Sequence, residues 1–243
     1  ITGGTVNLTS PATLVPTAAT SNRLVGVTVN GDLSIPSNGV VRIAGGLSVN
    51  GVVHLIGGSA DLAFEGTQTL SAGTIAFESG GLIEMVSAGT LTIAPGVTIR
   101  GGTGTIGGSR YWGAAMTWVN QGTIRADVSG QTLTISGAGF TNDPNATSQV
   151  SSGATLSVVS TNWSNASNIV VSGGTFNMGG TFTTTGIGSI TNVGGTVNII
   201  GTLNNAGATL TLNGTTGSWN LAGGTITGGT VNLTSPATLV PTA

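Results

Sequence analysis

The chain of 243 residues contains no cysteine and no lysine, and charged residues make up only 5% of it. Without cysteine it can form no disulfide and offers no thiolate to a metal or a substrate. Five arginines stand against seven acidic residues, which gives a formal net charge of −2. Nucleic-acid binding needs clustered Lys or Arg to neutralise phosphates, so we expect no nucleic-acid partner. The one histidine, His54, has no second His or Cys with which to bind a metal, and the sequence predicts no metal site and no cofactor.

Long hydrophobic runs are missing as well. Apolar stretches such as residues 52–56 are as short as a strand, whereas a membrane-spanning helix needs about 20 residues. We therefore expect no membrane insertion. The sequence also lacks the high charge of disordered chains, and its mean hydropathy is positive at +0.37. The chain is expected to fold, with a neutral polar surface.

Short strand-like segments occur along the whole chain. Residues 5–8, 27–30, 47–50 and 132–135 alternate apolar with small polar residues, the period of two that is typical of a strand with one buried face. Such segments commonly end in glycine, Asn-Gly or Gly-Gly, which accept the positive φ angles of tight turns. Helix patterns hardly occur, so the sequence predicts an all-β fold.

The spacing of these segments favours one β architecture. A recurring unit of about 20–23 residues, with two or three short strands and glycine corners, is typical of one coil of a β-solenoid. Residues 175–178 and 196–199 both read Thr-Φ-Asn-Φ, where Φ is apolar, and they lie one such unit apart. We therefore predict a right-handed parallel β-solenoid of roughly ten or eleven coils. An antiparallel sandwich or barrel, which also has short strands, is the alternative.

The C-terminal end of the chain repeats the N-terminal end without a substitution. Ile1–Ala18 and Ile226–Ala243 both read ITGGTVNLTSPATLVPTA. A tandem array whose unit corresponds to positions 1–225 explains this identity, and an introduced duplication of a capping segment is the alternative. We accordingly divide the chain into a first solenoid stretch, an aromatic junction, a second solenoid stretch and the start of a further repeat: residues 1–106, 107–121, 122–225 and 226–243.

The aromatic junction, GGSRYWGAAMTWVNQ, interrupts the strand pattern with the only tyrosine and two of the four tryptophans. We expect a short helix or a turn that loops out of the solenoid, with aromatic rings filling the core where stacking is interrupted. Alternatively, Tyr111, Trp112 and Trp118 form a platform on which sugars stack. They are the only candidates for a binding site that the sequence offers.

Catalysis on a β-helix would require acid–base groups gathered on one face, and the seven acidic residues are scattered. Asp61 and Glu65 lie on the same side of a strand, and Glu78 and Glu84 could approach them on successive coils. Two carboxylates that act on a glycosidic bond stand roughly 5–9.5 Å apart, a separation open to the pairs Asp61/Glu78 and Glu65/Glu84. The alternative interpretation is a set of charges that keeps one face soluble. We predict no catalytic residues and no enzymatic activity.

Gly-Gly-Thr-Φ-Asn phrases recur late in the chain, at residues 173–177, 194–198 and 228–232. Together with residues 163–165 and 201–205, they make the chain resemble the β-strand repeat regions of very large bacterial surface proteins, the filamentous-haemagglutinin-type and autotransporter-passenger solenoids. The resemblance implies a secreted rod at the cell surface. Neighbouring copies of the same repeat would be its end-to-end partners, with lateral fibre contacts or surface glycans as further ones. The resemblance supplies no active-site motif, and a fold alone does not settle a function.

These observations together predict a structural repeat unit of an extracellular bacterial fibre, stalk or surface filament. A surface adhesin that binds glycans or a partner cell is the second hypothesis. A polysaccharide-active β-helix enzyme is the third.

Overall fold

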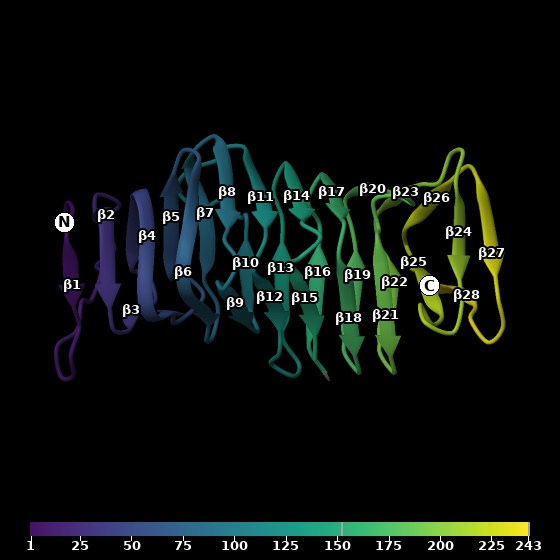
Figure 1. Ribbon diagram of the computed structural model, residues 1–243, viewed down its shortest axis with the longest axis horizontal. Helices are drawn as coiled ribbons and strands as arrows, with labels where there is room; N and C mark the ends of the chain where they lie inside the picture. Colours follow the sequence, from purple (N-terminus) through teal and green to yellow (C-terminus); the bar gives the residue numbers. More distant parts are fainter. Residues whose placement is uncertain (152, 243) are drawn as a thin grey trace.

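The computed structural model describes residues 1–151 and 153–242, and within these ranges the chain is all-β, with no helix. Its strands wind into a parallel β-solenoid of about 11 turns, which confirms the predicted fold class. In Figure 1 the strands lie side by side across the long axis of the molecule. They run from the N-terminal coil at one end to the C-terminal coils at the other.

The N-terminal coils contain long strands that run through more than one face of the solenoid. These coils are built from β1 (Thr5–Asn7), β2 (Arg23–Asn30), β3 (Leu33–Ile35), β4 (Val40–Leu55), β5 (Asp61–Glu65), β6 (Gln68–Phe77) and β7 (Leu82–Ser87). β4 has 16 residues and pairs with β2, β3, β5 and β6, so that one strand turns a corner and continues.

From β8 onward, successive coils add strands to three faces. The first face holds β8 (Gly89–Ile93), β11 (Met116–Asn120), β14 (Gly139–Asn142), β17 (Asn162–Asn165), β20 (Thr181–Thr183), β23 (Thr202–Asn204) and β26 (Thr225–Thr227). The second holds β9 (Thr98–Gly101), β12 (Thr123–Ala126), β15 (Thr147–Val150), β18 (Asn168–Ser172) and β21 (Ser189–Val193), and the separate pair β24 (Thr209–Leu212) and β27 (Thr230–Leu233) follows. The third holds β10 (Gly104–Ile106), β13 (Thr132–Ile135), β16 (Thr155–Val158), β19 (Thr175–Met178), β22 (Thr196–Ile199), β25 (Trp219–Ala222) and β28 (Leu239–Thr242).

The length of a coil is the number of residues between two positions that face each other on neighbouring coils. Most coils are close to the predicted length of about 20–23 residues. Leu156 faces Phe176 on the next coil, and Phe176 in turn faces Val197. One coil is clearly longer than these, because Gly104 faces Leu133. The additional residues lie in the aromatic junction, where residues 107–115 form an irregular loop and the strand β11 follows. The junction therefore consists of a loop and a strand rather than a helix.

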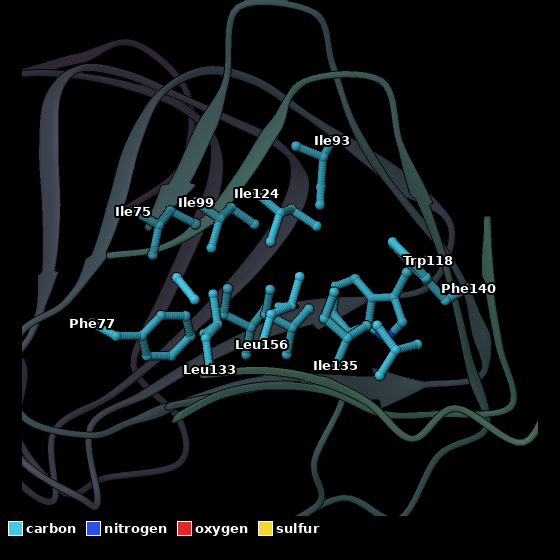
Figure 2. Packing of buried hydrophobic residues seen from close by; sticks show 14 of the residues in the cluster. Ile75, Phe77, Ile93, Ile99, Trp118, Ile124, Leu133, Ile135, Phe140 and Leu156 are labelled. Atoms are coloured by element: carbon cyan, nitrogen blue, oxygen red, sulfur yellow. The ribbon is translucent and has the colours of Figure 1, made fainter. Parts of the chain in front are cut away.

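Inward side chains of the same kind stack from coil to coil and form the core. Ile75 faces Ile99, which in turn faces Ile124, and Figure 2 shows the three in a row. Leu133 and Leu156 form part of a second column. All five side chains are at most 1% exposed. Each coil buries its apolar residues against the coils on either side, and this burial, at about 25 cal/mol per Å², holds the stack together.

One column in the core is polar. Asn120, Asn142 and Asn165 face one another on successive coils and are at most 3% exposed. Asn120 Nδ2 donates to Asn142 Oδ1 at 2.7 Å, and Asn142 Nδ2 donates to Asn165 Oδ1 at 2.8 Å. The hydroxyl of Ser148 donates to the same Asn142 oxygen at 3.2 Å. This ladder fixes the register of the coils, because a shifted pairing would leave buried amides without partners.

Corner glycines allow neighbouring coils to approach closely. A Cβ atom at Gly195 would lie 2.5 Å from Val171 Cγ1 and 2.7 Å from the carbonyl oxygen of Gly174. We expect Gly195→Ala to lower the free energy of unfolding by about 1–3 kcal/mol, the usual effect of overpacking, in urea denaturation. Gly214→Ala is the matched control, since a Cβ there meets no atom within 4 Å. Equal losses in the two variants would contradict this explanation.

Candidate functional site

Strand β5 differs from most strands of the solenoid because it is buried on both faces. Asp61, Leu62, Ala63 and Phe64 are all 0% exposed. Successive side chains of a strand point to opposite sides, so two of these four residues point into the core and two point outward. The outward face of β5 is therefore covered by another segment of the chain.

Residues 107–115, which we call the covering loop, form this cover. The covering loop follows β10 and folds back over coils that precede it in the sequence. The guanidinium of Arg110 donates to the carbonyl oxygen of Ser59 and, at 3.1 Å, to Asn38 Oδ1. Ser59 and Asn38 lie in the turns before β5 and β4, 51 and 72 residues earlier in the chain. Arg110 thus anchors the covering loop across the outside of the solenoid.

Glu84 of β7 lies under the covering loop, on its solenoid side, and binds its backbone. Its side chain is 0% exposed. Its carboxylate accepts the N–H of Arg110 at 2.9 Å and those of Tyr111 and Trp112 at 3.4 Å each. Successive backbone N–H groups that converge in this way form a concavity that suits an anion. These hydrogen bonds give the buried carboxyl group of Glu84 its partners and fix the loop over β7.

Asp61 lies beside Glu84 under the covering loop. Neither of its oxygens accepts a hydrogen bond from an N–H or hydroxyl group of the described residues. The pKa of Asp61 is raised from its ordinary value of 3.8 to about 9, mainly by burial; the hydrogen bond to Glu84 and the charge of Glu84 contribute to the rise, while the charge of Arg110 opposes it. At neutral pH Asp61 therefore keeps its proton and donates to Glu84.

Ion pairs and aromatic rings surround this carboxyl pair. Glu65 accepts hydrogen bonds from Arg23 at 2.8 and 2.6 Å, and Arg42 Nη2 lies 2.8 Å from Glu65 Oε1. The hydrogen bond from Arg23 lowers the pKa of Glu65, and the charge of Arg42 acts in the same direction. The guanidinium of Arg42 also lies 5.7 Å from the ring centre of Trp112. The rings of Trp112 and Tyr111 pack in an edge-to-face arrangement with their centres 5.5 Å apart. This cation–π contact ties the covering loop to β4.

The three aromatic residues considered as a binding platform do not lie together. Trp118 is 0% exposed in β11 and faces Phe140 in the core, as Figure 2 shows. Tyr111 and Trp112 belong to the covering loop on the outside of the solenoid. Tyr111 is 42% exposed, with the guanidinium of Arg110 lying 4.8 Å from its ring centre. The structure therefore separates one buried ring from two outer ones, and the three share no surface.

The carboxylates do not form the pairs that the sequence suggested, Asp61/Glu78 and Glu65/Glu84. Asp61 contacts Glu84 rather than Glu78, and Glu78 Oε1 instead lies 2.7 Å from His54 Nδ1. Glu65 is engaged with arginines rather than with Glu84. Asp61 and Glu84 are both 0% exposed, so neither is accessible to a substrate. The interpretation of these two residues as charges that keep a face soluble is wrong, because the covering loop buries them.

The anchoring role of Arg110 was not predicted from the sequence. Its partners lie 51 and 72 residues away, so no local pattern connects them. The available signal was indirect. Asp61 and Glu84 occupy outward positions of nearby coils, and the segment that breaks the strand pattern brings an arginine and a run of free backbone N–H groups.

Neither a metal-binding cluster nor a membrane-spanning helix occurs in the part of the chain that the structure describes. Among residues 1–151 and 153–242, no three His, Asp or Glu side chains gather as ligands for a metal ion. The same residues form no helix that is long and apolar enough to cross a membrane.

Comparisons with protein-family models, with curated proteins and with solved structures find no match to this chain. Its function is therefore inferred from its own geometry.

Proposed function

We propose that the chain is the structural repeat unit of a fibre in which successive units join into one continuous β-solenoid. The observation behind the proposal is the duplicated coil, because its two copies have different neighbours. In the first copy Val6 pairs with Val29 of the following coil. In the second copy Val231, which occupies the same position as Val6, pairs with Leu210 of the preceding coil. One coil thus has a complementary parallel partner on each of its edges.

Joining two units at the duplicated coil would place its valine between Leu210 of one unit and Val29 of the next. Both of these partners are buried, at 4% and 0% exposure, whereas Val231 at the end of this chain is 38% exposed. The threonine before this valine also has a matching partner on each side. Thr230 pairs with Thr209, and its copy Thr5 pairs with Thr28. The inward apolar column and the outward threonine column would therefore pass through the joint unchanged.

The two end coils expose apolar side chains that interior coils bury. Ten large hydrophobic side chains are exposed among the described residues. Five of them lie in the two copies of the duplicated coil: Ile1, Val15, Val231, Leu233 and Val240. The same coils carry open strand edges, which invite pairing with another chain. A neighbouring unit would cover the inward side chains of Ile1, Val231 and Leu233 together with the edges. Val15 and its copy Val240 point outward, because Val240 pairs with Asn220 of an outer ladder.

The proposal is tested by making Val231→Asp in the present chain and in a longer chain of two units, residues 1–225 followed by residues 1–243. In the present chain the substitution is expected to lower the free energy of unfolding by less than about 1 kcal/mol, since the side chain is partly exposed. In the two-unit chain, the same change at the internal joint is expected to cost about 3 kcal/mol or more, because an unpaired carboxylate is then enclosed between two coils. Urea denaturation measures both values.

Thr230→Asp in both chains is the matched control. Thr230 pairs with the exposed Thr209 and so points outward; its replacement is expected to have an equally small effect in each chain. A small effect of Val231→Asp in the two-unit chain would mean that the joint is not a continuous core, and the proposal would fail.

The resemblance to bacterial surface solenoids supports an extracellular position for this fibre, attached to the cell surface. In this proposal the partners of each unit are the neighbouring units, end to end. The role is mechanical: backbone hydrogen bonds run along the fibre axis, stacked apolar columns hold the coils together, and outward Thr and Asn side chains hydrate the surface.

A further inference from the structure

We propose that the covering loop is a pH-dependent latch, held closed by a single proton that Asp61 and Glu84 share. Loss of this proton releases residues 107–115 and opens the outward face of β5 and β7 to solvent. The latch goes beyond the mechanical role of the solenoid and does not depend on it.

The closed covering loop supplies hydrogen-bond donors to one carboxyl group and not to both. The backbone N–H groups of Arg110, Tyr111 and Trp112 all point to Glu84, and none points to Asp61. The guanidinium of Arg110 is engaged with a carbonyl oxygen and an amide oxygen in the turns before β5 and β4. Both carboxyl groups are 0% exposed, so water cannot solvate a second charge while the loop is closed.

The other charged groups around the pair do not replace the proton. On β4 and β5, Arg42 and Glu65 are paired with each other at 2.8 Å, and Glu65 also binds Arg23. Among the described residues, the charge of Arg110 on the loop lowers the pKa of Asp61, and Glu84 on β7 raises it. The balance of these groups leaves Asp61 protonated as long as the loop covers it.

The direction of the pH effect follows from proton linkage. With the loop open, Asp61 is in water and its carboxyl group has its ordinary pKa near 4, so at neutral pH it binds no proton. With the loop closed, Asp61 keeps its proton, because its pKa is raised to about 9. Closure is therefore weakened as the pH rises above about 5. Between about pH 5 and pH 9, the ratio of open to closed loop rises about tenfold for each pH unit.

Hydrogen–deuterium exchange of the backbone amides of residues 110–112 tests this latch. After correction for the intrinsic pH dependence of exchange, their protection is expected to fall about tenfold per unit between pH 6 and pH 8. The amides of β22, far from the loop in Figure 1, serve as the internal control and are expected to keep their protection. A constant protection of the loop amides, or an equal fall in β22, would overturn the proposal.

Asp61→Asn is the decisive variant. An asparagine has the shape of the protonated aspartic acid and donates an N–H to Glu84, but it has no proton to lose. Its loop amides are expected to stay protected at every pH from 6 to 9, and a fall as steep as that of the unmodified protein would contradict the latch. Infrared spectroscopy of the unmodified protein gives a second readout that needs no variant. A protonated carboxyl band at pH 7 that disappears above pH 9 agrees with the latch, and its absence at pH 7 rules the latch out.

Discussion

Trp118→Ala is expected to lower the free energy of unfolding by about 3–5 kcal/mol. The indole is 0% exposed and lies in the apolar column between Leu91 and Phe140. Its removal leaves a cavity that the regular coils on either side cannot collapse to fill, because each strand is fixed by pairing with its neighbours. Urea denaturation followed by circular dichroism measures the loss.

Tyr111→Ala is the matched control for this prediction. Tyr111 comes from the same aromatic junction, but its ring is 42% exposed on the covering loop. We expect its replacement to change the free energy of unfolding by less than about 1 kcal/mol. If both variants lost the same stability, or Tyr111→Ala lost more, the division of the junction into a core tryptophan and an outer loop would be wrong.

Asn142→Asp is expected to cost about 3–5 kcal/mol at pH 7, because it places an unpaired carboxylate in the core. The new carboxylate would still accept from Asn120 and Ser148, but it would turn a second oxygen toward Asn165 Oδ1, which now accepts a hydrogen bond at 2.8 Å. Burial would raise the pKa of the introduced carboxyl, so the folded state would have to take up a proton. The penalty should therefore grow as the pH rises above about 4 and shrink as the pH falls toward 4.

Asn198→Asp is the control for the amide ladder. Asn198 belongs to a similar ladder, with hydrogen bonds of 2.8 Å to Asn177 and 2.9 Å to Asn220, but this ladder lies on the outside of the solenoid, where water can solvate a carboxylate. Its replacement is expected to cost less than about 1 kcal/mol, with little dependence on pH. A pH-independent loss in Asn142→Asp would contradict the role that we assign to the buried ladder.

The repeating part of the fold could be predicted from the sequence because it is encoded locally. The alternation within residues 175–178 and 196–199 assigns inward and outward positions, and their spacing gives the coil length. The same alternation runs through Met116, Trp118 and Asn120, and it could have assigned Trp118 to the core. The regular spacing of Asn120, Asn142 and Asn165 likewise gives the buried ladder a signal in the sequence.

The covering loop could not be predicted in the same way. Its anchors Asn38 and Ser59 lie in turns that look like any other turn, and the contacts with Arg110 connect residues from different coils. Asp61 and Glu84 occupy outward positions, and an outward carboxylate is normally a surface charge. Only the path of the loop over β5 and β7 makes them a buried pair, and a path of this kind is set by tertiary contacts rather than by strand periodicity.

Continuation of one unit into the next as a single β-solenoid is the central claim. Electron microscopy of the native material, with measurement of its axial repeat, tests it most directly. We expect a long, thin filament in which strands are spaced about 4.8 Å along the axis and the unit repeats on the order of every 50 Å. Discrete particles without axial order would contradict the claim.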